Sequence, residues 1–334
     1  MEFFRKTNID FIGLRKYAFI FSLSLITLGV VSIIVRGGLN LGIDFVGGTL
    51  IQLKIEPMPS MEEVRRILVK NGLKTAQLQH FPKENEVIIR VKKGEIPLEE
   101  IQTESPVLSS QETFAAKAVS ETSAVSETAV SSSGMGMVGK KLHDMFTKEF
   151  PGAQIEIVRV EIVGPAVGKQ LMKQAMLALF WGLIGIMVYV GWRFEFKYSA
   201  PAVLALFHDA FITIGIFAFL NKEITVTVVA AILTLVGYSI NDTIVIYDRI
   251  REKIRFFARD ELGKVMNIAI NDTLSRTIIT SLTVIIVLLV LFFMGGEVLH
   301  DFAFALLIGV IIGTYSSIFV ASPLVYEWEK RHRR

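Results

Sequence analysis

The chain has 334 residues, of which 52% are hydrophobic, and it carries a formal net charge of +3. It contains no cysteine, which excludes disulfide bonds, thiolate catalysis and cysteine-ligated metal sites. Soluble domains are nearly as rich in apolar residues, so the distribution of these residues along the chain decides the class of protein.

Six apolar runs are long enough to cross a lipid bilayer. The hydrocarbon core is roughly 30 Å thick and a helix rises about 1.5 Å per residue, so a span needs about 20 mostly apolar residues. The runs are residues 17–35, 171–190, 200–220, 226–247, 277–294 and 302–325. The first follows basic residues, as in a signal peptide, but it exceeds the usual apolar region of about 7–15 residues and no small-x-small cleavage site follows. We therefore predict six retained transmembrane helices.

The distribution of Lys and Arg predicts the orientation of these helices, because cytoplasmic segments are enriched in both. They are concentrated in four segments: residues 1–16, the turn near 193–197, the connection 248–276 and the tail 326–334. The connections 221–225 and 295–301 hold a single Lys or Arg, Lys222. The basic segments fall on one side of a six-helix arrangement. We predict that both termini are cytoplasmic and that residues 36–165 lie outside the cytoplasm.

The segment 36–165 shows the pattern of a small α+β domain. Alternation of apolar and polar residues predicts strands at 49–56, 74–81, 86–91 and 154–163. A helix is predicted over 60–71, with Ser60 as its N-cap and Glu62 and Glu63 in its first turn, and a second over 138–150. The resulting order, strand, helix, strand, strand, helix, strand, is that of a ferredoxin-like split domain.

Residues 95–136 interrupt this pattern. They are rich in Ser, Thr, Ala, Val and Glu in a loose repeat and contain few aromatic residues. A segment of this composition buries little apolar surface, so we predict a flexible, solvated insertion in the domain.

Charged residues inside membrane spans are costly, and each is a candidate functional residue. Asp242 lies in the fourth span beside Asn241, and a carboxylate at the centre of a span costs about 3 kcal/mol on insertion scales. It is either a group that binds and releases protons or a carboxylate near the helix end that pairs with Arg249 or Arg251. We favour the first interpretation, because the apolar residues 244–247 continue the span beyond Asp242.

Three further residues are candidates for the same site. His208 and Asp209 lie midway along the third span, and neighbouring helix positions point about 100° apart, so we expect them to contact different partners. They form either a second polar layer beside Asp242 or a hydrogen-bonded pair that fixes helix packing. Arg276 precedes the fifth span and either pairs with an inward carboxylate and responds to its protonation, or anchors the helix at the membrane interface. The sequence leaves both pairs of alternatives open.

Several other kinds of chemistry have no support in the sequence. No phosphate-binding loop occurs, the five histidines form no His-Glu-x-x-His pattern, and no Gly-x-Ser-x-Gly motif is present. Basic residues are not interleaved with aromatic ones as in a nucleic-acid site. We expect no enzymatic activity, no cofactor, no metal site and no nucleic-acid partner.

Four motifs in chain order resemble signatures of the SecD/SecF family. Residues 41–49, Leu-Gly-Ile-Asp-Phe-Val-Gly-Gly-Thr, are similar to its Gly-Ile-Asp-Phe-x-Gly-Gly signature, and residues 163–168 to the motif before the second span. Residues 237–252 and 273–281 resemble the SecF branch of the family. We interpret the signature residues as structural, with glycines that tolerate unusual backbone angles. They are Gly42, Asp44, Gly47, Gly48, Gly164, Pro165 and Gly168.

The resemblance implies a half-size member of the RND superfamily that pairs with SecD to form a unit of twelve spans. It implies an accessory subunit of the Sec machinery in the bacterial inner membrane, which uses the proton-motive force to help the SecYEG channel translocate unfolded polypeptides. YajC and YidC are further partners that it suggests. In the family, the residues matching Asp242 and Arg276 are implicated in proton coupling. We include Asn241, His208 and Asp209 in the same candidate site.

Three other functions are alternatives to this one. A stand-alone RND exporter of small molecules or lipids is disfavoured, because such proteins usually carry two six-span halves in one chain. In a purely structural scaffold of the translocase, Asp242 would serve only in packing. An intramembrane protease is the least favoured of the three functions, because the sequence of the spans shows no pair of catalytic residues. The residues do not separate proton from sodium coupling, because both ions use carboxylates.

Overall fold

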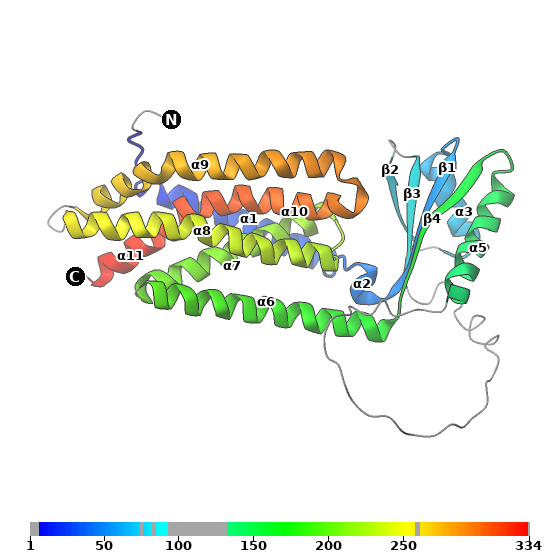
Figure 1. Ribbon diagram of the computed structural model, residues 1–334, viewed down its shortest axis with the longest axis horizontal. Coiled ribbons are helices and arrows are strands. Elements are labelled where there is room, and N and C mark those ends of the chain that lie inside the picture. The colour runs from blue at the N-terminus through cyan, green and yellow to red at the C-terminus, as the bar shows by residue number, and fades with distance from the viewer. Residues whose placement is uncertain are drawn as a thin grey trace, which may run out of the picture. The chain divides into compact units, whose positions relative to one another are not determined.

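The computed structural model describes residues 7–73, 76–81, 85–92, 132–194, 196–257 and 261–332. The chain divides into two compact units (Figure 1). The first consists of Met1–Gly42 and Gln170–Arg334 and is helical, and the second, Ile43–Lys169, contains the sheet.

Six helices of the described chain are long and apolar enough to span a membrane. They are α1 (Arg15–Val35), α6 (Pro165–Arg193), α7 (Phe196–Leu220), α8 (Val226–Phe256), α9 (Leu262–Met294) and the last span, in which α10 (Gly296–Ser316), the π-helical turn η1 (Ser317–Ala321) and α11 (Ser322–His332) follow one another. Each of the six apolar runs lies within one of these helices, so the predicted six-helix membrane bundle is confirmed.

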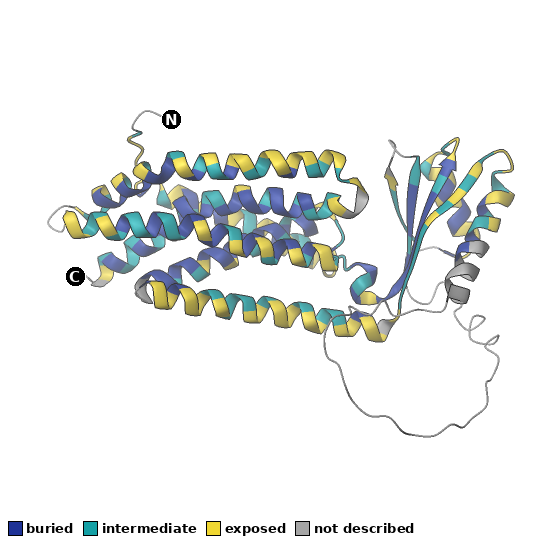
Figure 2. Ribbon diagram, in the orientation of Figure 1, coloured by how far each residue is buried: buried dark blue, intermediate teal, exposed yellow. Residues whose placement is uncertain are grey.

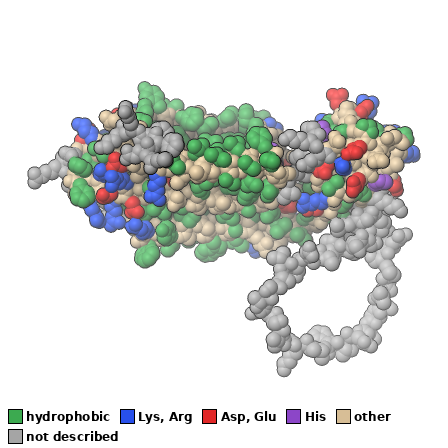
Figure 3. Space-filling model, turned by 45° about the horizontal axis from the view of Figure 1, so that its top comes forward, with side chains coloured by type: hydrophobic (Ala, Val, Ile, Leu, Met, Phe, Trp, Pro, Cys, Tyr) green, Lys and Arg blue, Asp and Glu red, His purple; other side chains and the backbone are tan. Residues whose placement is uncertain are grey.

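The helices differ in how much of their surface the bundle covers. In α7, α8 and the last span, half or more of the residues in the most apolar stretch are buried. In α1, α6 and α9 the corresponding shares are 17%, 6% and 17%. Figure 2 shows the exposed residues along α6 and α9, and Figure 3 shows hydrophobic side chains over the middle of the helical unit. Apolar surface of this extent suits contact with lipid or with another membrane protein.

Charged side chains gather at one end of the helical unit (Figure 3). Arg15 of α1 pairs with Glu327 of α11 at 2.9 Å, and Arg193 of α6 pairs with Asp248 of α8 at 3.1 Å. The N-terminal segment lies at the same end, because Asn271 of α9 accepts a hydrogen bond from the main chain of residue 9.

The predicted basic connection 248–276 is mostly helical. α8 continues to Phe256 and α9 begins at Leu262. Ion pairs favour these extensions: Arg249 lies 2.7 Å from Glu252 one turn on, and 2.6 Å from Asp272 of α9. Polar residues thus extend both helices beyond the apolar runs, which the hydropathy pattern alone did not indicate.

Helices α1 and α7 approach closely through two glycines. A Cβ atom on Gly29 would lie 2.7 Å from the Cα of Gly215. Such a distance is too short for a side chain, so glycine at both positions allows the two backbones to meet.

The second unit is a four-stranded antiparallel sheet with helices. Its elements are α2 (Ile43–Val46), β1 (Gly48–Glu56), α3 (Met61–Lys70), β2 (Gln77–Phe81), β3 (Glu86–Lys92), α5 (Ser132–Glu149) and β4 (Gln154–Val163). The strand order is β2-β3-β1-β4. This connectivity confirms the predicted ferredoxin-like arrangement.

The core of this unit lies between one sheet face and helices α3 and α5. Alternate residues of a strand share a face, and Ile51, Leu53 and Ile55 of β1 are completely buried. They pack with Leu68 of α3 and Phe146 of α5.

The insertion predicted at 95–136 lies mostly outside the described residues, which resume at residue 132. Its last five positions belong to α5, so the second helix of the domain begins earlier than the predicted residue 138.

The N-terminus of α3 has a reciprocal cap. The Ser60 hydroxyl accepts the Glu63 N–H at 3.3 Å, while the Glu63 carboxylate accepts the Ser60 N–H at 3.1 Å. The predicted N-cap Ser60 is confirmed, whereas the partner role of Glu63 was missed although Ser-x-x-Glu is its usual signal. The hydrogen bonds from the Ser60 side chain and main chain hold the pKa of Glu63 below its ordinary value of 4.5.

We expect Ser60→Ala to destabilise the start of α3 by about 1 kcal/mol at neutral pH. Because the folded pKa of Glu63 is lowered, the stabilisation from its ionised form is complete above 4.5 and is lost as the pH falls through the folded value. Hydrogen exchange of the α3 amides in the purified chain measures the difference from wild type. A difference that persists undiminished in acid would contradict the role of the Glu63 carboxylate.

Candidate functional site

One face of α8 carries polar side chains within an otherwise apolar membrane helix. Ser239, Asp242 and Thr243 are buried three or four positions apart, so they share the inward face. Val236 and Ile246, on the same face to either side, are buried and apolar. The sequence of α8 therefore places a polar layer between this helix and its neighbours.

Asp242 has few partners for a carboxylate at this depth. Its side chain is 3% exposed. The Ser281 hydroxyl of α9 lies 3.5 Å from Asp242 Oδ2, at the long limit of a hydrogen bond, and is itself 2.7 Å from Thr314 Oγ1 of α10. Within the described residues no Lys, Arg or His lies within ion-pair distance of Asp242. An ionised carboxylate so placed is costly, and binding a proton relieves that cost.

Arg276 of α9 does not form the direct ion pair with an inward carboxylate that was one of its two predicted roles. It is exposed, and it makes no ion pair within 4.0 Å of Asp242. The adjacent Thr277 is 1% exposed, and its hydroxyl has no hydrogen-bond partner among the described residues. Thr277, which follows Arg276 and lies one turn before Ser281, therefore contributes a buried hydroxyl group that has no hydrogen-bond partner among the described residues.

Asp209 lies in a second buried layer and has several partners. It is 0% exposed, and its Oδ2 accepts hydrogen bonds from Ser239 at 2.6 Å and Ser316 at 2.8 Å. Its Oδ1 lies 2.9 Å from His208 Nδ1. His208 and Asp209 do have different partners, as predicted, and the imidazole ring also bends back onto its neighbour, so the two side chains contact each other as well.

His208 connects this layer to α1. Its Nε2 lies 2.9 Å from the Ser22 hydroxyl of α1, and Ser22 is 3.2 Å from the hydroxyl of Tyr315 on α10. The Tyr315 hydroxyl also donates to the main-chain oxygen of Ala18 at 2.8 Å. The His208 side chain of α7 is thereby connected to α1, and through Ser22 to Tyr315 of α10.

Hydroxyl groups near the π-helical turn η1 form further buried hydrogen bonds to α8 and α10. Thr243 Oγ1 is 2.8 Å from Ser317 Oγ, while Ser316 and Ser317 both donate to the main-chain oxygen of Gly313. A Cβ on Gly313 would lie 3.0 Å from Ser239 Oγ, so glycine lets α10 approach α8 here. Turns of π-helix often occur at functional sites. The sequence analysis did not select these serines, although adjacent hydroxyl groups within an apolar run were a signal.

Asn241 does not belong to the buried layers. It is exposed on the outer face of α8, about 100° from Asp242. The exposed positions on this face are small or polar and recur every three or four residues: Thr227, Ala230, Thr234, Gly237 and Asn241. The structure thus joins Asp209 and His208 with Ser239 in one buried layer and Asp242 with Ser281 in another, and leaves Asn241 and Arg276 at the surface of the bundle.

Two signature glycines occupy backbone conformations that favour glycine. Gly47 and Gly48 have φ values of 79° and 158°, where side chains are disfavoured. The Gly42 N–H donates to the main-chain oxygen of Ile224 at 2.9 Å, which joins the segment after α1 to the connection between α7 and α8.

The second signature segment begins α6. Pro165 is the first residue of this helix, and a Cβ on Gly168 would lie 2.7 Å from the main-chain oxygen of Phe45. Asp44 lies with Phe45 in the short helix α2. Gly168 therefore permits close packing of α6 on α2, whereas a side chain at Gly164 would meet no atom within 4 Å.

The part of the chain that the structure describes contains no cluster of three or more His, Asp or Glu side chains arranged to hold a metal ion. The carboxylates of Asp209 and Asp242 instead contact hydroxyl groups and one imidazole. The fold and this site define a polytopic membrane protein with two linked polar layers inside its helical bundle and an α+β domain inserted between its first two spans.

Comparison with known proteins gives the family. Residues 141–331 match the model described as protein export membrane protein SecD/SecF, C-terminal, and residues 31–57 match the SecD/SecF GG motif. The chain belongs to the SecD/SecF family. The protein translocase subunit SecF of Magnetococcus marinus is 44% identical over 99% of this chain and 96% of its own, and that of Koribacter versatilis is 38% identical over 99% and 94%.

A solved structure shares the fold. The crystal structure of SecDF, a translocon-associated membrane protein from Thermus thermophilus, aligns with 97% of this chain at a TM-score of 0.77 and 32% identity. This chain spans 39% of the SecDF chain.

Proposed function

We propose that the protein is an accessory subunit of bacterial Sec protein export, which pairs with SecD and uses the proton-motive force to promote translocation. The observation that carries the proposal is Asp242, a buried carboxylate with one long hydroxyl contact in the middle of a membrane helix. Similarity to relatives named protein translocase subunit SecF supports the role in export. No catalysed reaction is part of the proposal.

Protonation of Asp242 would change the contacts between α8 and α9. Ser281 can donate a hydrogen bond to the carboxylate or accept one from the carboxylic acid, so the pair has two arrangements. The apolar interior of a membrane favours the neutral carboxylic acid over the ionised carboxylate. One proton moving across 100 mV supplies about 2.3 kcal/mol, which is enough to shift an equilibrium between states a few kcal/mol apart.

The chain connectivity offers a route from the bundle to the extramembrane domain. Helix α1 leads into β1, and β4 leads into α6. The two strands are paired, and Gly48 at the start of β1 is the register partner of Val163 at the end of β4. Both membrane connections therefore attach at one end of the sheet, and a change in the spacing of α1 and α6 would act on the domain there.

The exposed face of α8 supports pairing with SecD. An Asn side chain exposed within a membrane span is costly in lipid, and small residues allow close approach of a second helix. The SecDF chain that resembles this protein is more than twice its length, which leaves room for a second half. In the proposal, SecD covers the face that contains Thr234, Gly237 and Asn241. SecYEG, YajC and YidC are proposed partners on the family resemblance.

A bulky residue on this face should weaken the pairing. A side chain at Gly237 would meet no atom of this chain within 4 Å, so Gly237→Phe leaves the bundle intact and obstructs the partner. Overpacking typically costs about 1–3 kcal/mol, so we expect a roughly five- to hundredfold loss of co-purified SecD. Gly185→Phe on α6 is the matched control, since that position is equally open. Equal retention of SecD by both variants would show that another face binds SecD.

We also propose that both termini are cytoplasmic and that the sheet domain lies on the opposite, extracytoplasmic side of the inner membrane. The chain has no cysteine, so single cysteines can report the topology. Arg66→Cys on α3 is expected to react with a membrane-impermeant thiol reagent in intact spheroplasts. Lys264→Cys, at the start of α9, is expected to react only after permeabilisation. The reverse pattern would invert the proposed orientation.

Asp242→Asn tests the coupling itself, since it removes the titratable charge at nearly constant volume. If the protein is only a scaffold, this substitution leaves export unchanged.

A further inference from the structure

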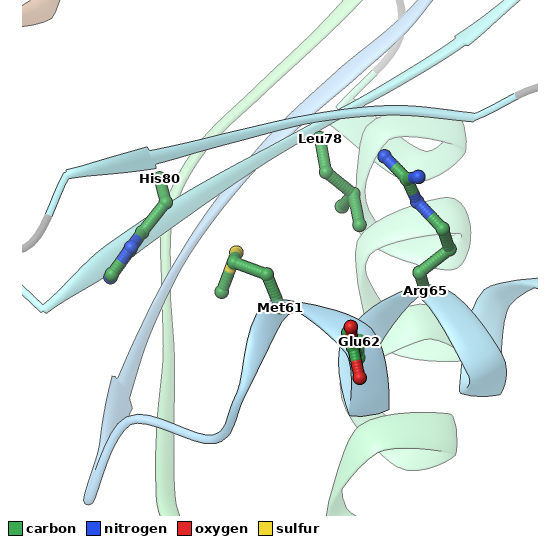
Figure 4. Close-up of a pocket in the computed structure, with 5 residues that line it drawn as sticks. All are labelled: Met61, Glu62, Arg65, Leu78 and His80. Atoms are coloured by element: carbon green, nitrogen blue, oxygen red, sulfur yellow. The ribbon is translucent and has the colours of Figure 1, made fainter.

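Thr277 of α9 carries a buried hydroxyl group without a hydrogen-bond partner among the described residues. The polar groups around the pocket of the sheet domain are different, because they are exposed and accessible to water. Figure 4 shows that pocket, which lies between α3 and β2 and is lined by Met61, Glu62, Arg65, Leu78 and His80. Nearly all buried polar groups in proteins have a hydrogen-bond partner, so the Thr277 hydroxyl requires an explanation.

The hydroxyl of Thr277 is not turned back onto its own helix. A threonine in a helix commonly donates to a main-chain oxygen three or four residues earlier. Thr273 and Thr280, on either side of Thr277, do so at 3.2 and 3.0 Å. Thr277 is 1% exposed and lies four positions before the buried Ser281, so the two hydroxyls share the inward face of α9.

Thr277 lies between two contacts that join α9 to α8. The two helices run in opposite directions: the Ser281 hydroxyl is 3.5 Å from Asp242, whereas Asp272, earlier in α9, is 2.6 Å from Arg249, later in α8. Four residues of helix rise about 6 Å, so Thr277 lies about one turn from the Asp242–Ser281 contact. Rotation of the Asp242 side chain, or a slide of α8 along α9 by up to one turn, would bring the carboxyl group to Thr277.

The hydroxyl hydrogens near Asp242 show which form of its carboxyl group suits Ser281. Each hydroxyl group has one hydrogen to donate. The Thr314 hydroxyl donates to the main-chain oxygen of Val310 at 2.7 Å, so Ser281 is the donor in its 2.7 Å contact with Thr314. Tyr238 also donates to Ser281, at 3.3 Å. Ser281 Oγ can therefore accept a hydrogen bond from the neutral carboxylic acid of Asp242, but its own hydrogen is engaged with Thr314.

Thr277 offers the complementary partner. Its hydroxyl can donate to the ionised carboxylate, which only accepts hydrogen bonds. A hydrogen bond to an ionised group is roughly twice as strong as one between neutral groups. The charged groups of the helices packed against this site are engaged or exposed: Arg249 pairs with Asp272, and Arg276 is exposed. Residues 302–326 contain no charged residue.

We propose that Thr277 is the hydrogen-bond partner of Asp242 in its ionised form, so that Asp242 contacts Ser281 when neutral and Thr277 when ionised. The inference deepens the proposed function and rests on it, because it assigns the two states of the coupled carboxyl group. Release of the proton breaks the O–H bond of the carboxylic acid and transfers the proton to a water molecule. In the proposed orientation Thr277 lies on the cytoplasmic side of Ser281, so the carboxyl group moves toward the cytoplasm as it ionises. Thr277 is a positioning residue and takes no proton itself.

Infrared difference spectroscopy of the purified complex with SecD tests the two states separately. Spectra in acid and in alkaline buffer contain the C=O band of the neutral group and the bands of the carboxylate, and those of Asp242 are lost in Asp242→Asn. We expect Thr277→Val to shift the carboxylate bands and to leave the C=O band unchanged, whereas Ser281→Ala should shift the C=O band. Unshifted carboxylate bands in Thr277→Val, or no carboxylate band from Asp242 in either buffer, would overturn the proposal.

The rate at which a proton-motive force completes translocation provides the second measurement. Thr277→Val keeps the branched shape but removes the hydroxyl, and we expect a roughly ten- to hundredfold slower rate, as for loss of a hydrogen bond to a charged group. Thr277→Ser keeps the hydroxyl and should retain the rate. Thr273→Val is the matched control, because Thr273 is buried on the same face and its hydroxyl is bound to the main chain of its own helix. It is expected to export normally.

The outcomes separate this role of Thr277 from the proposed function. If Thr277 serves only in packing, valine fills its place and export is normal. That result together with slow export by Asp242→Asn would contradict the role of Thr277 and leave proton coupling at Asp242 in place. Equal losses in Thr277→Val and Thr273→Val would also contradict it, since they would show a general effect of packing. Normal export by Asp242→Asn would instead contradict the proposed function, and this inference with it.

Discussion

Replacing Asp242 by Asn is expected to slow the energy-dependent step of export while the protein still assembles with SecD. The substitution keeps the volume and hydrogen-bonding capacity near Ser281 but removes the group that binds a proton. A proton crossing 100 mV contributes about 2.3 kcal/mol, so loss of one coupled proton slows the step by up to roughly fiftyfold. The readout is accumulation of unprocessed secretory precursors in cells depleted of the wild-type protein.

Asp248→Asn is the matched control for this experiment. Asp248 lies on the same helix but pairs with Arg193 in a partly exposed position, where an ion pair contributes about 0–1 kcal/mol. It is expected to export normally. Membrane abundance and co-purification with SecD are measured for both variants. Normal export by Asp242→Asn would show that Asp242 takes no part in proton coupling, and would favour a purely structural role for the protein in the translocase.

Replacing Asp209 by Ala is expected to lower the stability of the helical unit by about 3–5 kcal/mol. The substitution leaves the hydroxyls of Ser239 and Ser316 and the imidazole of His208 without their shared acceptor in a fully buried position. The expected result is a strong loss of membrane abundance and of thermal stability in detergent.

Ser22→Ala is the graded control, because it removes a single partner of His208 and should cost about 1 kcal/mol. The two alternatives for the His208–Asp209 pair give different outcomes. A packing role predicts that export falls in proportion to abundance. Normal abundance of Asp209→Ala with loss of export would instead place Asp209 in the coupling itself.

Much of the fold follows from patterns that act locally. Apolar runs of bilayer length predicted the six helices, and alternation in segments such as 154–163 predicted the strands. Ser60 was recognised as an N-cap because that signal depends only on adjacent residues. The extent of α8 and α9 was not predicted, because ion pairs between distant residues such as Arg249 and Asp272 stabilise their polar ends.

The candidate site was predicted only in part. Asp242 and Asp209 were selected because charge is costly in a membrane span, and both are buried. The outward position of Asn241 follows from helical periodicity, since it lies about 100° from Asp242. The contacts of Asp209 with Ser239 and Ser316 depend on how three helices pack, and no spacing within one helix encodes them.

The most direct test of proton coupling at Asp242 uses membrane vesicles that contain this protein with SecD and the translocation channel. A precursor is arrested part-way, a proton-motive force is imposed, and the rate at which translocation completes is measured for wild type and Asp242→Asn. The account predicts that the proton gradient accelerates completion in wild type and has no such effect in the variant. Equal acceleration of both, or acceleration of wild type by a sodium gradient alone, would contradict proton coupling at Asp242.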